Sequence, residues 1–546
     1  MVGDTGVINP LETQAPMNPI RDRCPTSWSI AALVAICAAA PAPAAAPVHT
    51  FWGMVSEPSY PTRTCATLPA AIRSQNWSVD EVDADGVRTH PDHDRIQQAI
   101  DACRGGAVKL VRGPQGENAF LSSPLTLRSG VTMWVDKGVT LFASRDPRDY
   151  DTGDGFCGTA TKEHHRSCRA FINGRQLEDA GIVGEGTIDG RGGSRLLAGP
   201  NKGKSSWWDL AMLSKHGLSQ NVFRLVALDG GSRLTLYRTT FENSPNFHVV
   251  PNNFRGITAW GIKILTPSAE YSRPGYACPP GTTPAETESA TCFTPDTVKN
   301  TDGFDPGQSS DVLLAYSWIS DGDDNVAIKA GGTTPSRNQV YAHNHFYYGH
   351  GMSIGSETNG GAEHILVTDL VMDGMDSPNG NGLRIKSDAS RGGQVRDVLF
   401  EHVCMRREAR PLVFDTYYSD RPGTLLPDFQ GIVVRDFHYL AGGRYGAGTS
   451  VFRGFVEGEH RLPLQVTLDT VVFEGGVPAI SPGGKAGGPT AAHISLAGPN
   501  AFAGVLTASA ANDVTVATIP SAVSAPLVDC RRAFVPLSSA MPDSPI

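Results

Sequence analysis

The stretch "DVLLAYSWISDGDDNVAIKA", residues 311–330, places a polar bend between two short apolar runs. Neighbouring side chains on a β-strand point to opposite faces. A regular strand would therefore split the adjacent Asp323 and Asp324, and one carboxylate would be buried without a partner, which is costly. Gly322, directly before the pair, gives the backbone the freedom to bend. The stretch predicts short strands joined by sharp turns, with two carboxylates at one turn.

Similar stretches recur along the chain, and they begin near residues 233, 256, 311, 338, 364, 397 and 431. Most starts are 23 to 34 residues apart, and the one wider gap holds an insertion from Ser268 to Pro295. Two or three short strands every two dozen or so residues predict a solenoid. We expect an all-β, single-stranded right-handed parallel β-helix, with a β-sandwich or propeller as the alternative.

The two ends of the predicted solenoid differ in character. The segment "HPDHDRIQQAIDACRGG", residues 90–106, has Ile96, Ile100 and Cys103 at helical spacing and predicts a short helix that caps the N-terminal end. From about residue 477 the chain is rich in Ala, Gly, Pro and Ser, which predicts a final irregular coil closed by Cys530. No second domain is expected within residues 47–546.

Residues 1–46 are typical of a leader with a signal peptide, because Arg21 and Arg23 precede a short apolar run and then small residues. Met17 is a candidate for the true start. The run is too short and too interrupted by proline for a membrane span. We therefore predict a secreted protein that is not membrane-bound in its mature form.

Eight of the ten cysteines lie outside this leader, and an even number fits disulfides in an oxidising compartment. The sequence leaves their connectivity open. Proximity favours Cys157 with Cys168 and Cys278 with Cys292, which leaves Cys65 with Cys103 and Cys404 with Cys530. No CxxC pair or HExxH motif is present, so a zinc site has little support.

The chain holds 46 basic and 55 acidic residues, a net charge of −9. A nucleic-acid partner usually requires a basic field, so we expect none. If the substrate is an anion, positive charge must be concentrated locally.

Four consecutive parts of the repeat carry unusual polar residues in register. In chain order they are Asn300 to Asp302, Gly322 to Asp324, Gly349 to Gly351 around His350, and Arg384 with Lys386. Each alone is typical of a solvated turn or strand. Their order and coil-like spacing predict that stacking brings three carboxylates, one imidazole and two cations to one strip.

Three carboxylates in one place cannot all ionise easily, so at least one pKa should rise. Glycoside hydrolysis needs such a set, with one protonated acid for the leaving oxygen and one carboxylate for the water. Arg384 and Lys386, two apart on a strand, point the same way and suit a sugar carboxylate.

The strings "NTDGFDP", "GDDNVAIKA", "GHGMSIGSE" and "NGLRIKSD" resemble the signature segments of the polygalacturonases, glycoside hydrolase family 28, and especially the bacterial endopolygalacturonases. Further likeness lies in "GTIDGRGG", "SSWWDL" and "NSPNFHVV", so the resemblance covers about residues 65–476. It implies a parallel β-helix that hydrolyses α-1,4-galacturonan with inversion, with pectin as partner and no cofactor or metal. We also expect a monomer.

The resemblance assigns roles residue by residue. It implies that Asp323 is the general acid, that Asp302 and Asp324 hold and deprotonate water, and that His350 shares a proton with the acid or acts electrostatically. Arg384 and Lys386 would bind a galacturonate carboxylate, and Asn300 belongs to the substrate-binding set. The substrate tyrosine corresponds to Tyr418, with the adjacent Tyr417 as the alternative.

Several alternatives remain open at the level of sequence. The long insertion leaves exo action possible, and rhamnogalacturonan or xylogalacturonan hydrolases belong to the same family. A pectate lyase would need Ca²⁺ held by several carboxylates, which these motifs do not resemble. A non-catalytic carbohydrate-binding β-helix would not need three clustered carboxylates.

Overall fold

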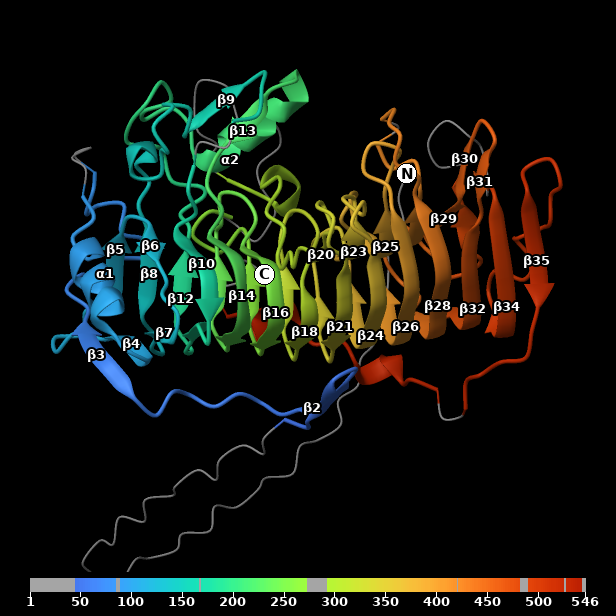
Figure 1. Cartoon of the computed structure of the whole chain (residues 1–546), viewed down its shortest axis with the longest axis horizontal. Coiled ribbons are helices and arrows are strands. Elements are labelled where there is room, and N and C mark those ends of the chain that lie inside the picture. The colour runs from blue at the N-terminus through green and yellow to red at the C-terminus, as the bar shows by residue number, and fades with distance from the viewer. Residues whose placement is uncertain are drawn as a thin grey trace, which may run out of the picture. The chain divides into compact units, whose positions relative to one another are not determined.

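The computed structural model describes residues 45–542, apart from 85–88, 166–167, 273–291, 420, 482–489 and 525–526. Of the predicted leader, only residues 45 and 46 are described, and Met17 lies outside the described residues. The coil-forming strands pair in parallel with the equivalent strands of the next coil (Figure 1). This stacking confirms the predicted parallel β-helix.

The largest sheet in the described part of the chain has 23 strands and forms two of the solenoid's faces. Several strands are long enough to bend from one face to the next: the first half of β24 pairs with β21 and its second half with β22. The strands of this sheet are β3 (Thr64–Pro69), β4 (Gly106–Val111), β5 (Ala119–Ser122), β6 (Leu125–Thr126), β7 (Val131–Val135), β8 (Thr140–Ala143), β10 (Ile172–Glu178), β11 (Gly181–Val183), β12 (Thr187–Asp189), β14 (Val226–Tyr237), β15 (Thr240–Glu242), β16 (Val249–Trp260), β17 (Lys263–Leu265), β18 (Ser310–Ala315), β19 (Trp318–Ser320), β21 (Ser336–Ala342), β22 (His345–Phe346), β24 (Ala362–Asp373), β26 (Gln394–Arg406), β28 (Asp428–Tyr439), β32 (Leu464–Phe473), β34 (Ala492–Asn500) and β35 (Val514–Thr518).

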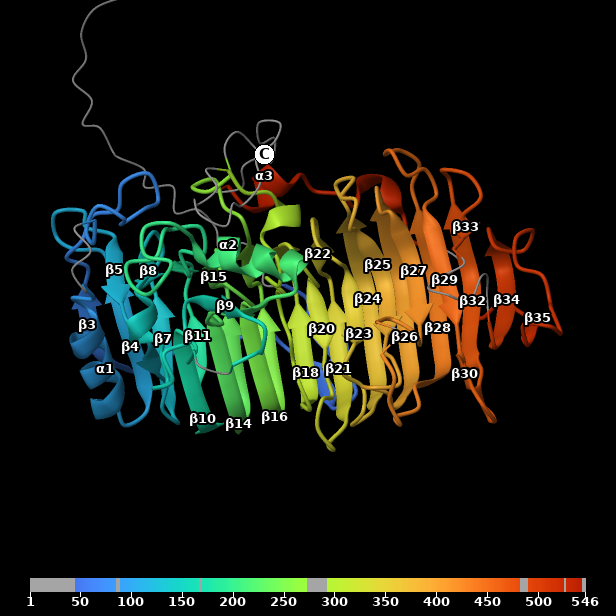
Figure 2. The ribbon, with the colours of Figure 1, turned by 90° about the horizontal axis from the view of Figure 1, so that it is seen from above.

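A six-stranded parallel sheet forms the third face (Figure 2). Its strands are β20 (Val326–Ile328), β23 (Met352–Gly355), β25 (Asn381–Lys386), β27 (Arg410–Asp415), β29 (Thr449–Arg453) and β33 (Ala479–Ile480). Isolated parallel bridges from Phe304 to Val249 and to Val326 continue this face into two earlier coils. We refer to it below as the third sheet.

The core is a set of apolar ladders inside the coils. In the third sheet Val326 pairs with Met352, Met352 with Leu383, and Leu383 with Leu412, and all four are fully buried. Burial of each such side chain contributes about 1.5–3 kcal/mol. Because side chains alternate, the residues between them point outward. This alternation places Ser353 and Arg384 on the outer surface of the third sheet.

The predicted capping helix is present as α1 (His93–Ala102), with Ile96 and Ile100 fully buried. Three predicted disulfides are confirmed: Cys65–Cys103, Cys157–Cys168 and Cys404–Cys530. Cys292 is also disulfide-bonded, but its predicted partner Cys278 lies outside the described residues.

Regular strands extend further toward the C-terminus than the sequence predicts, because β34 and β35 continue the parallel ladder beyond residue 477. Ala and Gly are weak strand formers, so the sequence of this region did not predict strands. β34 forms nevertheless, because it pairs in parallel with Val466 to Leu468 of β32. After β35 the chain reaches Cys530 and α3 (Leu537–Ala540), which packs on Leu265 and Tyr347.

Smaller elements decorate the coils. They are α2 (Trp207–Met212) and three antiparallel strand pairs. Two pairs are hairpins, β1 (Val48–Thr50) with β2 (Gly53–Val55) and β30 (Phe455–Glu457) with β31 (His460–Leu462), and the third joins β9 (Thr159–Thr161) to the distant β13 (Ser219–Asn221). In the described part of the chain, no helix has the length and apolar character that crossing a membrane requires.

Candidate active site

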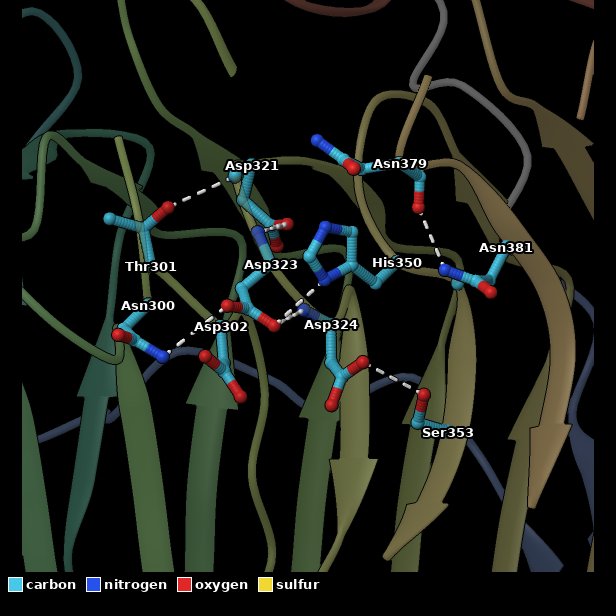
Figure 3. Close-up of polar contacts among 12 residues, drawn as sticks. Asn300, Thr301, Asp302, Asp321, Asp323, Asp324, His350, Ser353, Asn379 and Asn381 are labelled. Carbon is cyan, nitrogen blue, oxygen red and sulfur yellow. Dashed lines mark hydrogen bonds and ion pairs between the residues drawn. The ribbon is translucent and has the colours of Figure 1, made fainter. Parts of the chain in front are cut away.

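The polar residues singled out in the sequence lie at the start of the third sheet. Phe304 bridges to Val326, and Val326 pairs with Met352. Asp302, Asp324 and His350 each stand two residues before one of these positions, so they occupy matching places in three successive coils. Figure 3 shows their side chains gathered with Asp323 above the strands.

The bend at Asp323 and Asp324 is fixed by the loop around Gly322. The Gly322 amide donates to the Thr301 hydroxyl (2.9 Å), and the Asp323 amide donates to the Asp321 carboxylate (3.1 Å). A Cβ added at Gly322 would lie 2.4 Å from the carbonyl oxygen of Val298. The glycine is therefore needed for close approach of two backbones, and its φ is not positive, which corrects the expectation that it supplies conformational latitude.

Asp324 is 1% exposed and sits between two cations from β25. Its carboxylate accepts from Lys386 Nζ at 2.6 Å, from the Arg384 guanidinium at 3.3 Å, and from the Ser353 hydroxyl at 2.9 Å. Burial alone would raise the pKa of Asp324, but the charges of Lys386 and Arg384 outweigh it and lower the pKa. Asp324 is thus an ionised carboxylate in the free protein.

Asp323 faces the opening of the site, with a side chain that is 15% exposed. His350 Nδ1 lies 2.9 Å from Asp323 Oδ1, and the Asn300 amide donates to Asp323 at 3.4 Å. Burial tends to raise the pKa of Asp323, while the charge and hydrogen bond of His350 lower it, and the net direction is downward.

The pKa of Asp302 is shifted in the opposite direction, upward. It is 3% exposed, and its Oδ1 accepts no hydrogen bond from the described part of the chain. Burial raises its pKa well above the ordinary value, and the negative charges of Asp323 and Asp305 raise it further. Of the three predicted carboxylates, Asp302 is therefore the one whose surroundings favour the protonated form.

Tyr418 lies over the two cations of β25. Its ring centre is 5.1 Å from the Arg384 guanidinium and 5.0 Å from Lys386 Nζ, and the residue is 43% exposed. Tyr417 instead packs on Phe455 and donates its hydroxyl to the Val456 carbonyl. Of the two predicted alternatives, Tyr418 is the one beside the cluster.

Three further side chains of the same cluster, Lys329, Asp305 and Glu357, were not predicted from the sequence. Lys329, at the end of β20, lies 3.9 Å from Asp302 and 3.9 Å from Asp305, and it also faces Glu357 at 3.6 Å. Burial raises the pKa of Asp305 to about 7. A signal existed in "GDDNVAIKA", since Lys329 follows the inward Ile328 and must point outward.

One atom each of Asp323, Asp324 and His350 lies within 4.8 Å of the others, a spacing that a cation could use. However, Lys386 and Arg384 already contact both oxygens of Asp324, and His350 is bonded to Asp323. These contacts favour an acid–base role over metal binding.

A groove continues from the cluster toward the N-terminal coils. A hollow of about 900 Å³ beside Asn300 and Glu357 is also lined by Arg224 and Arg175. A second hollow of about 880 Å³ shares these two arginines and adds Arg128 and Arg169. We call this surface the arginine groove. It concentrates positive charge in a chain that is acidic overall.

Comparison with known proteins gives matches over most of the chain. The model of glycosyl hydrolases family 28 matches residues 103–443. A polygalacturonase of Ralstonia solanacearum is 53% identical over 504 residues, 91% of this chain and 94% of the relative. An endo-polygalacturonase of Pectobacterium carotovorum subsp. carotovorum is 40% identical over 69% of this chain and 82% of its own.

One solved structure is similar to this chain in fold. The polygalacturonase from Erwinia carotovora ssp. carotovora superposes with a TM-score of 0.63 and 34% sequence identity. The match covers 80% of this chain and 98% of that structure. The family match over residues 103–443 includes the coils that carry the cluster.

Proposed function

The chain belongs to glycosyl hydrolases family 28, and we propose that it is a secreted endo-polygalacturonase that hydrolyses α-1,4 bonds within de-esterified polygalacturonate, with inversion. The observation that carries this proposal is the acid–base cluster beside two cations. Asp302, Asp323, Asp324 and His350 supply proton transfer, while Arg384 and Lys386 supply charge for an anionic sugar.

In this proposal Asp323 protonates the glycosidic oxygen. It is the carboxyl group of the three that is most open to the groove, and the His350 ring bonded to it can share the proton. In the free protein the charges of His350, Lys386 and Arg384 hold the pKa of Asp323 low. A uronate carboxylate bound to Arg384 and Lys386 would offset two of these charges, so substrate binding itself favours the protonated acid.

Asp324 and Asp302 hold the attacking water. Asp324 is ionised and accepts the water proton, and the raised pKa of Asp302 lets the pair share that proton between two adjacent carboxylates. Arg384 binds a uronate carboxylate through its planar donors, and Tyr418 packs the sugar beside it. Asn300, bonded to Asp323, completes the substrate-binding set.

The arginine groove supports internal cleavage. It runs from the cluster over the coils of β16, β14, β10 and β6, so a polymer can extend past the cleavage point instead of ending there. Parallel strands are about 4.8 Å apart, so these coils give roughly 19 Å of additional binding surface. The central part of the insertion from Ser268 to Pro295 lies outside the described residues.

A digest of de-esterified polygalacturonate by the purified protein tests the proposal. Reducing ends, ultraviolet absorbance of unsaturated products and oligomer sizes are followed together. Early mixed oligomers with new reducing ends and no absorbance are the expected result. Monomer alone from the start would mean exo action, absorbance would mean a lyase, and activity confined to branched pectins would mean a rhamnogalacturonan or xylogalacturonan hydrolase. Binding without any product would mean a non-catalytic carbohydrate-binding protein.

A further inference from the structure

Lys329 directly follows β20, and it faces a different set of carboxylates from Arg384 and Lys386, which both pair with Asp324. Its Nζ lies 3.9 Å from Asp302 Oδ2, 3.9 Å from Asp305 Oδ2 and 3.6 Å from Glu357 Oε2. These carboxylates come from the coil before β20 and from the coil after it. The ammonium group therefore ties three consecutive coils together beside Asp302.

The carboxylates around Lys329 need this charge. Asp302 Oδ1 and both oxygens of Asp305 are buried and accept no hydrogen bond within the described part of the chain. A buried carboxylate without hydrogen bonds is costly in its charged form. Among the charges that act most strongly on Asp302, that of Lys329 favours ionisation, whereas those of Asp323, Asp305 and Asp324 oppose it.

The position of Lys329 also argues against a direct grip on the substrate. Its side chain is 21% exposed, and the three carboxylates lie 3.6–3.9 Å from its ammonium group, so they act on it as charges and not through hydrogen bonds. The Phe247 ring, 5.7 Å away, covers a further side of the ammonium group. The negative charge of these carboxylates weakens the attraction of the ammonium group for a uronate carboxylate.

We propose that Lys329 is a positioning residue for hydrolysis: it holds Asp302 against β20 and keeps that carboxylate available to assist Asp324 with the attacking water. The inference rests on the proposed function of Asp302. Without Lys329, Asp302 would stay protonated over more of the working pH range, and the water would have one carboxylate instead of two.

The sign of the effect follows from the surrounding charges. Loss of Lys329 raises the pKa of Asp302, so the acidic limb of the pH profile moves to higher pH. Loss of the Asp305 charge lowers the pKa of Asp302, so the same limb moves to lower pH. The charged or titratable groups that face the Asp302–Lys329 pair are Arg224, Asp305, Asp321, Asp323, Asp324 and Glu357.

The test compares Lys329→Met, Lys329→Arg and Asp305→Asn with the wild-type protein, using kcat/KM on polygalacturonate as a function of pH. We expect the acidic limb to rise by about one pH unit in Lys329→Met and to fall in Asp305→Asn, with Lys329→Arg close to wild type. KM should change little in all three. Circular dichroism and the melting temperature identify any variant that fails to fold. If either Lys329→Met or Asp305→Asn fails to fold, the pH profile of the other variant still tests the inference.

Four results would overturn the inference. A rise in KM without a movement of the limb would make Lys329 a substrate contact. Equal losses of kcat with fixed limbs would make it a purely structural residue, as would a Lys329→Arg variant no better than Lys329→Met. Infrared titration of the Asp302 carboxyl, assigned by subtraction of an Asp302→Asn spectrum, measures the same shift without substrate. An unshifted Asp302 pKa there contradicts the inference, whereas a wild-type protein inactive on polygalacturonate contradicts the proposed function.

Discussion

Asp323 differs from the other carboxylates of the cluster because it is partly open to the groove and is bonded to a histidine. We predict that Asp323→Asn lowers kcat by about 10²–10⁴-fold, the usual contribution of a general acid. The amide cannot donate a proton to the leaving oxygen, while its size preserves the fold. Initial rates on polygalacturonate, with the melting temperature as the check on folding, measure the effect.

Asp369→Asn is the matched control, since Asp369 also faces a histidine, His343 at 3.2 Å, but lies at an exposed coil corner. Its φ is 48°, a conformation that asparagine adopts readily. Its activity should equal that of the wild-type protein. Near wild-type turnover in Asp323→Asn would remove Asp323 from the acid role.

Lys386 has two functions in this geometry, and the sequence suggested only one of them. It is 4% exposed and bonded to Asp324 at 2.6 Å, so in the proposed function it supports the Asp324 carboxylate as well as binding the substrate. We predict that Lys386→Met raises KM for polygalacturonate and also lowers kcat, because the pKa of Asp324 rises when its main counter-charge is lost. Saturation curves at several pH values measure both effects, and an unchanged KM would exclude the contact with a uronate.

The residues of the cluster were predictable where they form a pattern. Asp302, Asp324 and His350 recur at coil spacing, and Arg384 and Lys386 alternate with an apolar residue, so stacking alone brings them together. Asp305 and Lys329 were missed because each sits singly near a strand end, where a charged residue is ordinarily solvated. The side chains of Asp305 and Lys329 meet because Gly307 pairs with Lys329 across neighbouring coils. A sequence pattern does not reveal this pairing.

At the scale of elements, the C-terminal tail is fastened to the solenoid by one long-range disulfide. Cys404 in β26 and Cys530 are 126 residues apart, and both are 1% exposed. Beyond Cys530, α3 packs on Tyr347, whose hydroxyl donates to the Val535 carbonyl at 2.8 Å. Tyr347 precedes His350 by three residues, so the tail supports the loop that carries the histidine.

We predict that the double variant Cys404→Ser with Cys530→Ser is destabilised by about 5 kcal/mol, because the lost cross-link closes a long loop. The pair Cys157→Ser with Cys168→Ser is the control, since its separation of 11 residues predicts about 3 kcal/mol. Melting temperatures under one scan rate compare the two. The first variant should also lose kcat through the loosened Tyr347 loop. Equal melting temperatures, or a larger loss in the control pair, would contradict the account.

Strands were predictable from the sequence, but the corners between them were not. Asp311, Asn338, His364 and Asp397 stack at one corner with φ between 53° and 57°. Asparagine, aspartate and histidine all adopt this left-handed conformation more often than other side chains, but each is also common elsewhere, so none marks a corner by itself. Stacking of equivalent residues in successive coils is what identifies the corner.

At the scale of the whole solenoid, the repeat length was enough to predict the architecture, because each coil needs a neighbour to bury its apolar ladder. The arginine groove could not be predicted in this way. Its four arginines come from three coils that share no motif, and they face one another because strand register aligns Thr126 with Asn173 and Arg175 with Asp229. A sequence pattern records neighbours along the chain, whereas a groove depends on neighbours across coils.

The arginine groove allows a test that distinguishes substrate binding away from the cleavage point from the cleavage reaction itself. Arg169→Gln with Arg175→Gln removes two exposed cations from the coil of β10, so KM for long polygalacturonate should rise roughly fivefold per arginine, the limit for exposed ion pairs. Short oligomers that reach only Arg384 and Lys386 should be cleaved as before. Added salt should narrow the difference, since it screens exposed charges. Arg255→Gln, which removes an exposed arginine outside the groove, is the control. An equal loss on long and short substrates would place these arginines outside the path of the polymer.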